Sequence, residues 1–186
     1  MFIPLLKPHR MPAAFLHLYV ASTERCGLGL FTARPWREGE TVMAQKDRDY
    51  FANACSYEEI TLRGYTHREI FQVGENLFIP PSGNIDDFTN HCCDPNTGIR
   101  LTKDGFEVIA LGDILPGEEI TYDYSTYQDR HEEDMACLCS ARFCRGVVRS
   151  FKHLPHGLQR YYLERRVVAP FNEPYVALTP LKAANL

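Results

Sequence analysis

Residues 84–96 read NIDDFTNHCCDPN, a run that gathers amides, carboxylates, a histidine and two cysteines. By itself the run could be a polar loop, because its last residues, DPN, are a good turn sequence. The neighbouring His91 and Cys92 could instead suggest a thiol nucleophile, although a catalytic pair is rarely adjacent in sequence. The segment becomes specific only in combination with two segments that follow it.

The first of these is a cysteine cluster, in which Cys137, Cys139 and Cys144 form a C-x-C-x4-C pattern. The total of seven cysteines is odd, which argues against a disulfide framework and favours metal or thiol chemistry. Structural zinc takes four tetrahedral ligands, so these three cysteines leave one position open. The candidates for the fourth ligand are His131, Cys92 and Cys93. Spacing alone does not choose among them, and three ordinary reduced cysteines are the alternative.

The second is the run EEITYDY at residues 118–124, which predicts a strand. On a strand, Tyr122 and Tyr124 point to one face, while Thr121 and Asp123 point to the other. Two tyrosines of this kind can simply pack on a core. They can also form the wall of a pocket, where ring faces attract a cation and phenol oxygens accept hydrogen bonds.

Composition indicates one compact domain with a core of its own, since the chain has 186 residues of which 45% are hydrophobic and 24% charged. The net charge of −4 argues against nucleic acid as the main partner and suits a basic peptide. No apolar run approaches the roughly 20 residues that cross a bilayer, and the apolar patch at the N-terminus is too short for a signal peptide. We therefore expect no membrane association and a cytoplasmic or nuclear location.

Short extended segments between Gly, Pro and polar turns predict a mostly β fold with few short helices. Strands are expected at 15–20, 27–33, 41–44 and 119–124, and hairpins at 71–80 and 97–111. A helix is expected at 56–62, because Ser56 and Glu59 have the spacing of a capping box. A second is expected at 155–166, with Leu154, Leu158, Tyr161 and Tyr162 on one face.

Four blocks together resemble the SET-domain protein lysine methyltransferases that carry a post-SET zinc motif. They are ERCGLGLF (24–31), GNIDDFTNHCCDPN (83–96), GEEITYDY (117–124) and the run from Cys137 to Gly146. The blocks are similar to the family's G-x-G-L-F, N-H-S-C-x-P-N, G-E-E-L-x-Y-D-Y and C-x-C-x4-C-R-G motifs, in that order. The resemblance covers residues from about 15 to 148.

This resemblance implies a β-clip-like fold of small curved sheets with a knot-like crossing, where the 84–96 segment meets the tyrosine strand. We expect the chain to divide into an N-terminal segment (1–14), a SET domain (15–128), a post-SET zinc-binding segment (129–150) and a C-terminal helical extension (151–186), and the family's motifs do not account for the last of these. The resemblance also implies transfer of a methyl group from S-adenosylmethionine to a lysine of a protein substrate, with histones as one candidate. No direct contact with nucleic acid is expected, and the sequence does not indicate the oligomeric state.

Carried over by position, the resemblance assigns roles to individual residues. The methyl donor would be held by Gly27, Leu28, Gly29, Asn90, His91, Tyr124 and Leu138. Tyr124 would be the catalytic tyrosine, and Tyr122 would occupy the position of the family's phenylalanine/tyrosine switch, so that we expect mono- or dimethylation. Cys93 would complete a zinc site with Cys137, Cys139 and Cys144, and Cys92 would have no ligand role.

The sequence departs from the family pattern at Asp86-Asp87, where Ala-Arg is common. With Asp94, Glu132, Glu133 and Asp134, these carboxylates could form an acidic rim for a basic peptide, although a solvated acidic loop would have the same sequence. Two other functions remain open at this point. One is a zinc-stabilised SET-like domain that binds partners without turnover. The other is a thiol-dependent enzyme that uses Cys92 or Cys93.

Overall fold

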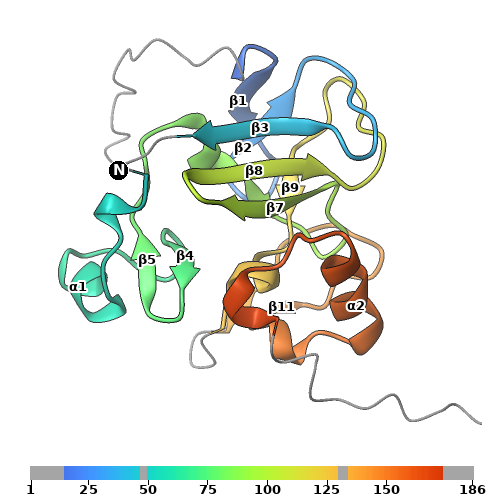
Figure 1. Cartoon of the computed structure of the whole chain (residues 1–186). Coiled ribbons are helices and arrows are strands. Elements are labelled where there is room, and N and C mark those ends of the chain that lie inside the picture. Colours follow the sequence, from blue (N-terminus) through green and yellow to red (C-terminus); the bar gives the residue numbers. More distant parts are fainter. Residues whose placement is uncertain (1–14, 47–49, 130–133, 174–186) are drawn as a thin grey trace, which may run out of the picture.

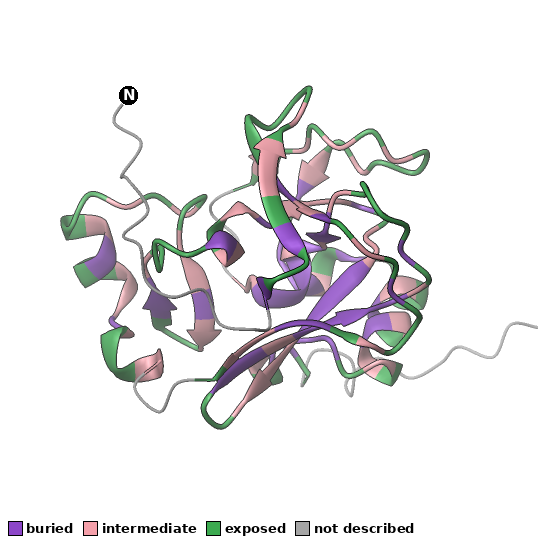
Figure 2. Cartoon of the chain, turned by 90° about the horizontal axis from the view of Figure 1, so that it is seen from above, coloured by how far each residue is buried: buried purple, intermediate pink, exposed green. Residues whose placement is uncertain are grey.

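A computed structural model describes residues 15–46, 50–129 and 134–173. In this part of the chain five small sheets surround a common core, which confirms the mostly β fold (Figure 1). The largest sheet is antiparallel, in the order β3-β8-β7, with β3 at Thr41–Lys46, β7 at Thr97–Thr102 and β8 at Gly105–Ala110. Figure 2 shows buried residues along these central strands.

Two antiparallel hairpins flank this sheet. Strands β1 (Leu18–Ser22) and β2 (Leu28–Thr32) form one, and β4 (Phe71–Gly74) and β5 (Leu77–Ile79) form the other. A further short pair joins β10 (Met135–Ala136) to β11 (Val147–Val148). The hairpins expected at 71–80 and 97–111 are confirmed, because each turn is specified locally by glycine and polar residues.

Gly105 shows why one of these turns needs glycine. It has a φ of +145°, and a Cβ there would collide with the backbone carbonyl of Gln45 on β3. Strands β3 and β8 can therefore approach closely at this point because Gly105 has no side chain.

The helix predicted at 56–62 is confirmed as α1 (Tyr57–Leu62), with the capping box between Ser56 and Glu59. A bridge between Cys55 and Phe78 joins this helix to the β4–β5 hairpin, and Ile60 packs between them. Helix α1 and the hairpin thus form one lobe beside the main sheet (Figure 1).

The predicted strand at 119–124 is only partly correct. Strand β9 covers Thr121–Tyr122, and Tyr124 already begins the 3₁₀ helix η4 (Tyr124–Tyr127). The Asp123 side chain accepts a hydrogen bond from the backbone N–H of Ser125, which caps this helix and ends the strand. The remaining 3₁₀ helices are η2 (Tyr50–Asn53), η3 (Ile85–Phe88), η5 (Phe151–His153) and η6 (Pro170–Asn172).

The second predicted helix is confirmed as α2 (His156–Glu164), with Tyr162 buried. The chain after it is fully buried at Val167, which packs in a second cluster with Phe151 and Tyr162, and at Ala169, which packs in the main core. A Cβ on Gly98 of β7 would collide with Val167, and the backbone carbonyl of Thr126 accepts hydrogen bonds from the Ala169 N–H (2.9 Å) and from Asn172 Nδ2 (3.1 Å). The described part of the C-terminal extension is therefore built into the domain.

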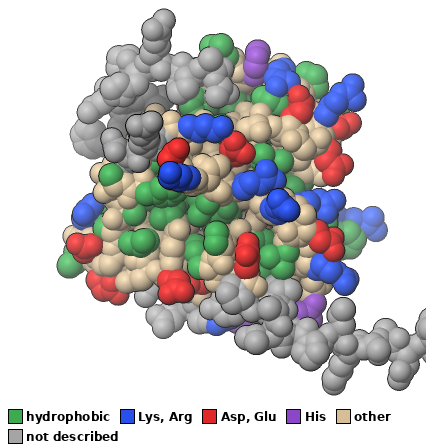
Figure 3. All heavy atoms as spheres, in the orientation of Figure 1, with side chains coloured by type: hydrophobic (Ala, Val, Ile, Leu, Met, Phe, Trp, Pro, Cys, Tyr) green, Lys and Arg blue, Asp and Glu red, His purple; other side chains and the backbone are tan. Residues whose placement is uncertain are grey.

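The predicted segments 1–14 and 174–186 lie outside the described residues. In the described part, no helix combines the length and the apolar character needed to cross a membrane. Figure 3 shows Lys and Arg interspersed with Asp and Glu on one face of the molecule, around hydrophobic side chains.

Candidate active site

The centre of the site is a parallel pair of very short strands. Strand β6 (Asn90–His91) pairs with β9, in the register Asn90 to Thr121 and His91 to Tyr122. The N–H of Cys92 extends the pair with a hydrogen bond to the carbonyl of Tyr122 (3.1 Å). The segment at 84–96 and the tyrosine segment therefore lie side by side, as the resemblance implied.

On one side of this pair, the β2 backbone approaches Asn90. Asn90 Nδ2 donates to the carbonyl of Leu28 (2.9 Å) and to Oε1 of Glu119 (2.7 Å). A Cβ on Gly29 would lie 3.0 Å from Asn90 Nδ2 and would also collide with Glu119. Glycine at this position therefore lets the side chains of Asn90 and Glu119 pack directly against the β2 backbone, and we call this group of contacts the Gly29 cradle. It presents backbone and amide groups of the kind that can hold a donor molecule.

The other expected donor-binding residues are placed differently. Gly27 has a φ of +79° in the turn that leads into β2, and Leu28 is exposed at the start of that strand. Leu138, between two cysteines, is 58% exposed. Their assignment to the donor stays a prediction.

The possible ligand atoms of His91, Cys93, Cys137 and Cys139 form a compact cluster, in which all lie within 4.8 Å of one another. The Cys93 and Cys137 sulfurs are 3.7 Å apart, and the Cys144 and Cys137 sulfurs are 3.6 Å apart. Four sulfurs at the usual Zn–S distance of about 2.3 Å lie about 3.8 Å from one another in a tetrahedron. The two sulfur–sulfur distances at Cys137 therefore have the spacing expected of a zinc–thiolate site, and the assignment of all four cysteines as ligands stays a prediction.

Burial raises the pKa of Cys93 to about 11, so its thiol is protonated at neutral pH unless a bound cation stabilises the thiolate. The neighbouring Cys92 is outside this group of ligand atoms, and although its thiol interacts with that of Cys139 it also donates to the carbonyl of Asp94 (3.3 Å). His131, the other candidate ligand, lies outside the described residues.

The ring of His91 lies beside the cysteines, with Nε2 3.3 Å from the Cys93 sulfur. Its Nδ1 accepts the N–H of Tyr124 (3.2 Å), which assigns the ring proton to Nε2. Burial lowers the pKa of His91 to about 4, so the ring is neutral at pH 7. In this arrangement His91 donates to the Cys93 sulfur as an outer partner of the cluster.

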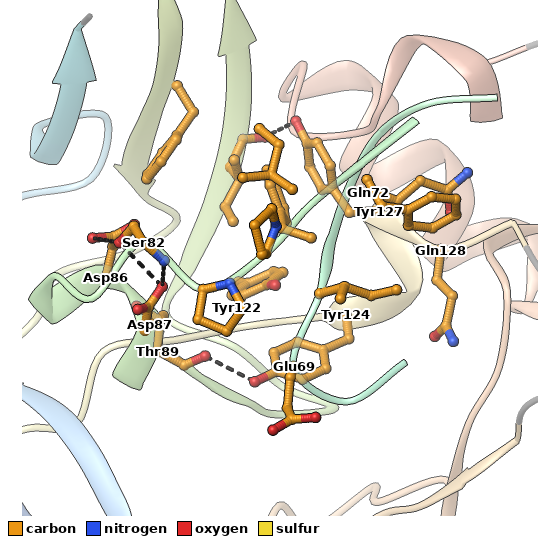
Figure 4. Close-up of a pocket in the computed structure, with 18 of the residues that line it drawn as sticks. Glu69, Gln72, Ser82, Asp86, Asp87, Thr89, Tyr122, Tyr124, Tyr127 and Gln128 are labelled. Atoms are coloured by element: carbon orange, nitrogen blue, oxygen red, sulfur yellow. Dashed lines mark hydrogen bonds between the residues drawn. The ribbon is translucent and has the colours of Figure 1, made fainter. Parts of the chain in front are cut away.

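On the opposite side, Tyr122 and Tyr124 line a pocket between the α1 lobe and the main sheet (Figure 4). Their ring centroids are 4.7 Å apart, and Tyr127 stacks on Phe71 at 5.0 Å. Although the two tyrosines do not share one strand, η4 brings Tyr124 back beside Tyr122. The aromatic lining comprises Tyr50, Tyr57, Phe71, Phe78, Phe106, Tyr122, Tyr124 and Tyr127.

The Tyr124 hydroxyl donates to the backbone carbonyl of Thr89 (2.9 Å), as Figure 4 shows. Its hydrogen is therefore engaged, and the oxygen lone pairs remain available as acceptors. Burial raises the pKa of both Tyr122 and Tyr124 above that of an ordinary phenol, so both remain protonated at neutral pH.

Carboxylates lie along the same pocket: Glu69, Asp86 and Asp87 (Figure 4). Asp87 accepts from the backbone N–H groups of Ser82 (2.9 Å) and Gly83 (2.6 Å), so much of its role is to hold this turn. Burial and the neighbouring Asp87 raise the pKa of Asp86 to about 6. Of the other acidic residues considered for the rim, Asp134 pairs with Arg149, whereas Glu132 and Glu133 lie outside the described residues.

Sequence reasoning missed the buried carboxylate between the two tyrosines. Asp123 is 1% exposed and accepts from Arg145 Nη2 (2.7 Å), from the Tyr162 hydroxyl (3.1 Å) and from the Ser125 N–H (3.1 Å). Arg145 follows Cys144 directly, and Tyr162 lies on α2. One carboxylate therefore connects the tyrosine segment with the cysteine segment and the C-terminal helix.

Comparison with known proteins agrees with this arrangement. A family model described as SET domain matches residues 27–125, slightly more than half of the chain. The chain belongs to the SET domain family. The matched residues include β6, β9, Tyr122 and Tyr124, whereas the cysteine segment and α2 come after the match.

Two curated relatives of this SET domain are histone-lysine methyltransferases. The H3 lysine-4 specific histone-lysine N-methyltransferase of Saccharomyces cerevisiae is 40% identical over 86 residues, covering 42% of this chain and 8% of that protein. The putative histone-lysine N-methyltransferase 1 of Plasmodium falciparum is 31% identical over 144 residues, covering 70% of this chain and 2% of that protein. The chain thus spans only a small part of the length of these relatives.

Solved structures share the SET fold. The methyltransferase domain of human SETMAR aligns with a TM-score of 0.54 at 23% identity, over 72% of this chain and 58% of that one. KRYPTONITE, solved with mCHH DNA, an H3(1–15) peptide and SAH, aligns with a TM-score of 0.55 at 22% identity, over 70% of this chain and 29% of that one. At these identities the likeness concerns the fold alone.

Proposed function

We propose that this protein is a protein-lysine N-methyltransferase that uses S-adenosylmethionine, with histone tails as the first substrates to test. The observation that carries the proposal is the position of Tyr124. Its hydroxyl lines the aromatic pocket, while its backbone N–H bonds to His91 on the strand that also carries Asn90. The pocket and the cradle beside Gly29 thus approach one another at a single tyrosine.

The pocket suits a lysine side chain for physical reasons. A lysine of pKa near 10.4 must lose a proton before its nitrogen can attack, which costs about 4.6 kcal/mol at pH 7. Aromatic walls disfavour the ammonium form and lower this cost. At the entrance, Asp86 and Glu69 attract the cationic chain around the target lysine.

Tyr124 would orient the amine and would not act as its base. The phenol remains protonated and its hydrogen is bound to Thr89, so the oxygen can accept an N–H from the neutral amine and aim the nitrogen lone pair. Holding the amine in line with the methyl group supplies the advantage of proximity. The proton that the lysine loses passes to solvent.

When bound, S-adenosylmethionine supplies a methyl group on a positively charged sulfur, which takes back the carbon–sulfur electron pair as the nitrogen–carbon bond forms. Gly27, Leu28, Gly29, Asn90, His91 and Leu138 would hold the donor. Cys93, Cys137, Cys139 and Cys144 would hold a structural zinc ion, whose role is to fix the cysteine segment against β6.

The relatives' names support histones as substrates and, with them, a nuclear location. The KRYPTONITE structure contains an H3 peptide and SAH, so it supports testing a histone peptide and an S-adenosyl ligand with this protein. Of the other functions, the thiol-dependent enzyme is disfavoured because burial raises the pKa of both Cys92 and Cys93 to about 11, which leaves little thiolate without a metal.

The test is a transfer assay with the purified protein, isotopically labelled S-adenosylmethionine and a panel of histone peptides, read by mass spectrometry. A mass gain at a lysine, absent when that lysine is replaced by arginine, is the expected result. Donor binding without transfer to any peptide or to a proteome extract would instead support a non-catalytic binding module.

A further inference from the structure

Glu119 is an acidic side chain beside the Gly29 cradle to which the sequence motifs assigned no role. It lies just before β9, where its backbone forms a bridge with Phe31 of β2. Its Oε1 accepts a hydrogen bond from Asn90 Nδ2 at 2.7 Å, and a Cβ on Gly29 would collide with the same oxygen. The carboxylate therefore lies against the two groups that form the cradle.

The Glu119 charge also reaches the catalytic side of the site. After burial, it is among the causes that raise the pKa of Tyr124, and it raises the pKa of Cys26 as well. Glu119 thus acts on groups of the turn that precedes β2 and on the tyrosine that reaches the pocket. A ligand bound among these groups would lie within the field of the carboxylate.

Within the described residues, no Lys, Arg or His lies within ion-pair distance of Glu119. Its hydrogen-bond partner there is the neutral amide of Asn90. A half-buried carboxylate without a cation is electrostatically unsatisfied, and a positive ligand placed nearby would be stabilised. Asp123, by comparison, has Arg145 as its cation.

Asn90 is oriented by the same contact. Both of its amide hydrogens are engaged, one by Leu28 and one by Glu119, so Oδ1 remains as an acceptor. An acceptor oxygen next to a carboxylate makes the cradle complementary to a cation in two ways, by hydrogen bonding and by charge.

We propose that Glu119 is a donor-recognition residue that orients Asn90 and makes the site prefer the cationic methyl donor over the neutral product. This inference rests on the proposed function. S-adenosylmethionine carries a positive sulfonium, whereas S-adenosylhomocysteine carries a neutral thioether and is otherwise nearly identical. A carboxylate that interacts with the sulfonium therefore gives the two ligands different affinities. A carboxylate that contacts only the amino group of the ligand, or that only stabilises the fold, does not.

The experiment is calorimetric titration of the whole protein with each of the two ligands, comparing wild type with Glu119→Gln. Glutamine keeps an oxygen that can accept from Asn90 but removes the charge. We expect the affinity for S-adenosylmethionine to fall by about fivefold or more, and that for S-adenosylhomocysteine by less than about twofold. Equal losses for both ligands, or no loss for either, would overturn the proposal.

Glu118→Gln is the matched control, because Glu118 is exposed and its carboxylate accepts only locally, from the Leu115 N–H (2.8 Å). It should change neither affinity. If Glu119→Gln does not fold, Glu119→Asp keeps the charge but withdraws it from the cradle. The ratio of the affinity for S-adenosylmethionine to that for S-adenosylhomocysteine should then fall at least about twofold, because the attraction between carboxylate and sulfonium weakens with distance. An unchanged ratio would contradict the proposal.

The wild-type titration separates this inference from the proposed function. A wild-type protein that binds neither ligand contradicts the function itself. A wild-type protein that binds both, with the same affinity ratio as Glu119→Gln, contradicts only the role of Glu119.

Discussion

Arg145 Nη2 lies 2.7 Å from Oδ1 of Asp123, and this ion pair joins the cysteine segment to the tyrosine segment. The Asp123 side chain is completely buried and also accepts from Tyr162 on α2. The pair thus couples the environment of the pocket tyrosines to two segments that follow the SET match. Its removal should affect the whole domain.

We predict that Arg145→Ala destabilises the protein by about 3–5 kcal/mol, since it leaves a buried carboxylate without its cation. Arg149→Ala is the matched control, because Arg149 pairs with Asp134 on the surface at 2.9 Å. The control should cost less than about 1 kcal/mol. Chemical denaturation of both variants measures the difference. Similar losses in the free energy of unfolding would show that the buried ion pair stabilises the protein no more than the surface pair does.

The cysteine cluster should hold about one zinc ion per chain. We predict that Cys93→Ser lowers the metal content of the purified protein and its melting temperature, whereas Cys92→Ser leaves both near the wild-type values. Elemental analysis with thermal denaturation makes the comparison. Equal loss of zinc from both variants would contradict the assignment of Cys93, and a metal-free wild type would contradict the site.

Tyr124→Phe should reduce the turnover number by about 100-fold or more, because the oxygen that orients the amine is lost. Donor affinity should change by less than about twofold, since the ring and the backbone N–H to His91 remain. Transfer kinetics and calorimetry test the two parts separately. Near-normal turnover would exclude an orienting role for the hydroxyl.

Tyr122→Phe should shift the products toward trimethyl-lysine, because the variant removes a hydroxyl that restricts the space for an already methylated amine. Mass spectrometry of a peptide after long incubation reads the distribution. Tyr161→Phe, on α2, is the control and should leave it unchanged. Wild-type protein that already gives mainly trimethyl-lysine would refute this role.

Asp86 gives a prediction about pH. Its pKa is raised from 3.8 to about 6 in the folded protein, so the folded state binds more protons between these values and stability falls as pH rises through this window. Asp86→Asn should therefore be more stable than wild type by about 1–2 kcal/mol at pH 7.5, with no gain below pH 4. It should also bind a basic peptide less well.

Denaturation at both pH values and peptide titration at pH 7.5 measure these effects, with Asp104→Asn, at an exposed position in the turn between β7 and β8, as control. A stability gain that persists at low pH would show that the carboxylate charge is not its cause. Unchanged peptide affinity would remove Asp86 from the substrate entrance.

Local features were predictable from the sequence. The Ser56–Glu59 capping box and the glycine turns of the hairpins each act within a few residues, so composition and spacing suffice to specify them. The pairing of Asn90 with Thr121 was expected only through the family resemblance, because a two-residue parallel strand has no pattern of its own. The compact sulfur cluster was expected in the same way, through Cys93.

Other features depend on contacts that no spacing encodes. The partners of Asp123 are 22 and 39 residues away, and nothing in the local sequence distinguishes Tyr162 from Tyr161. The expectation that Tyr122 and Tyr124 share a strand face was wrong because the Asp123 side chain caps η4. Glu119 was treated as part of a motif, and its proximity to Gly29 became visible only when β2 and the tyrosine segment were placed together.

The hydrogen bonds from Ala169 and Asn172 to the Thr126 carbonyl have a consequence for synthesis of the protein. They fix the helix that carries Tyr124, yet their donors leave the ribosome more than forty residues after it. The nascent chain can therefore form its hairpins early, but these two bonds to η4 can form only after residue 172 has emerged. A ribosome that stops before this point should release a chain without partial activity.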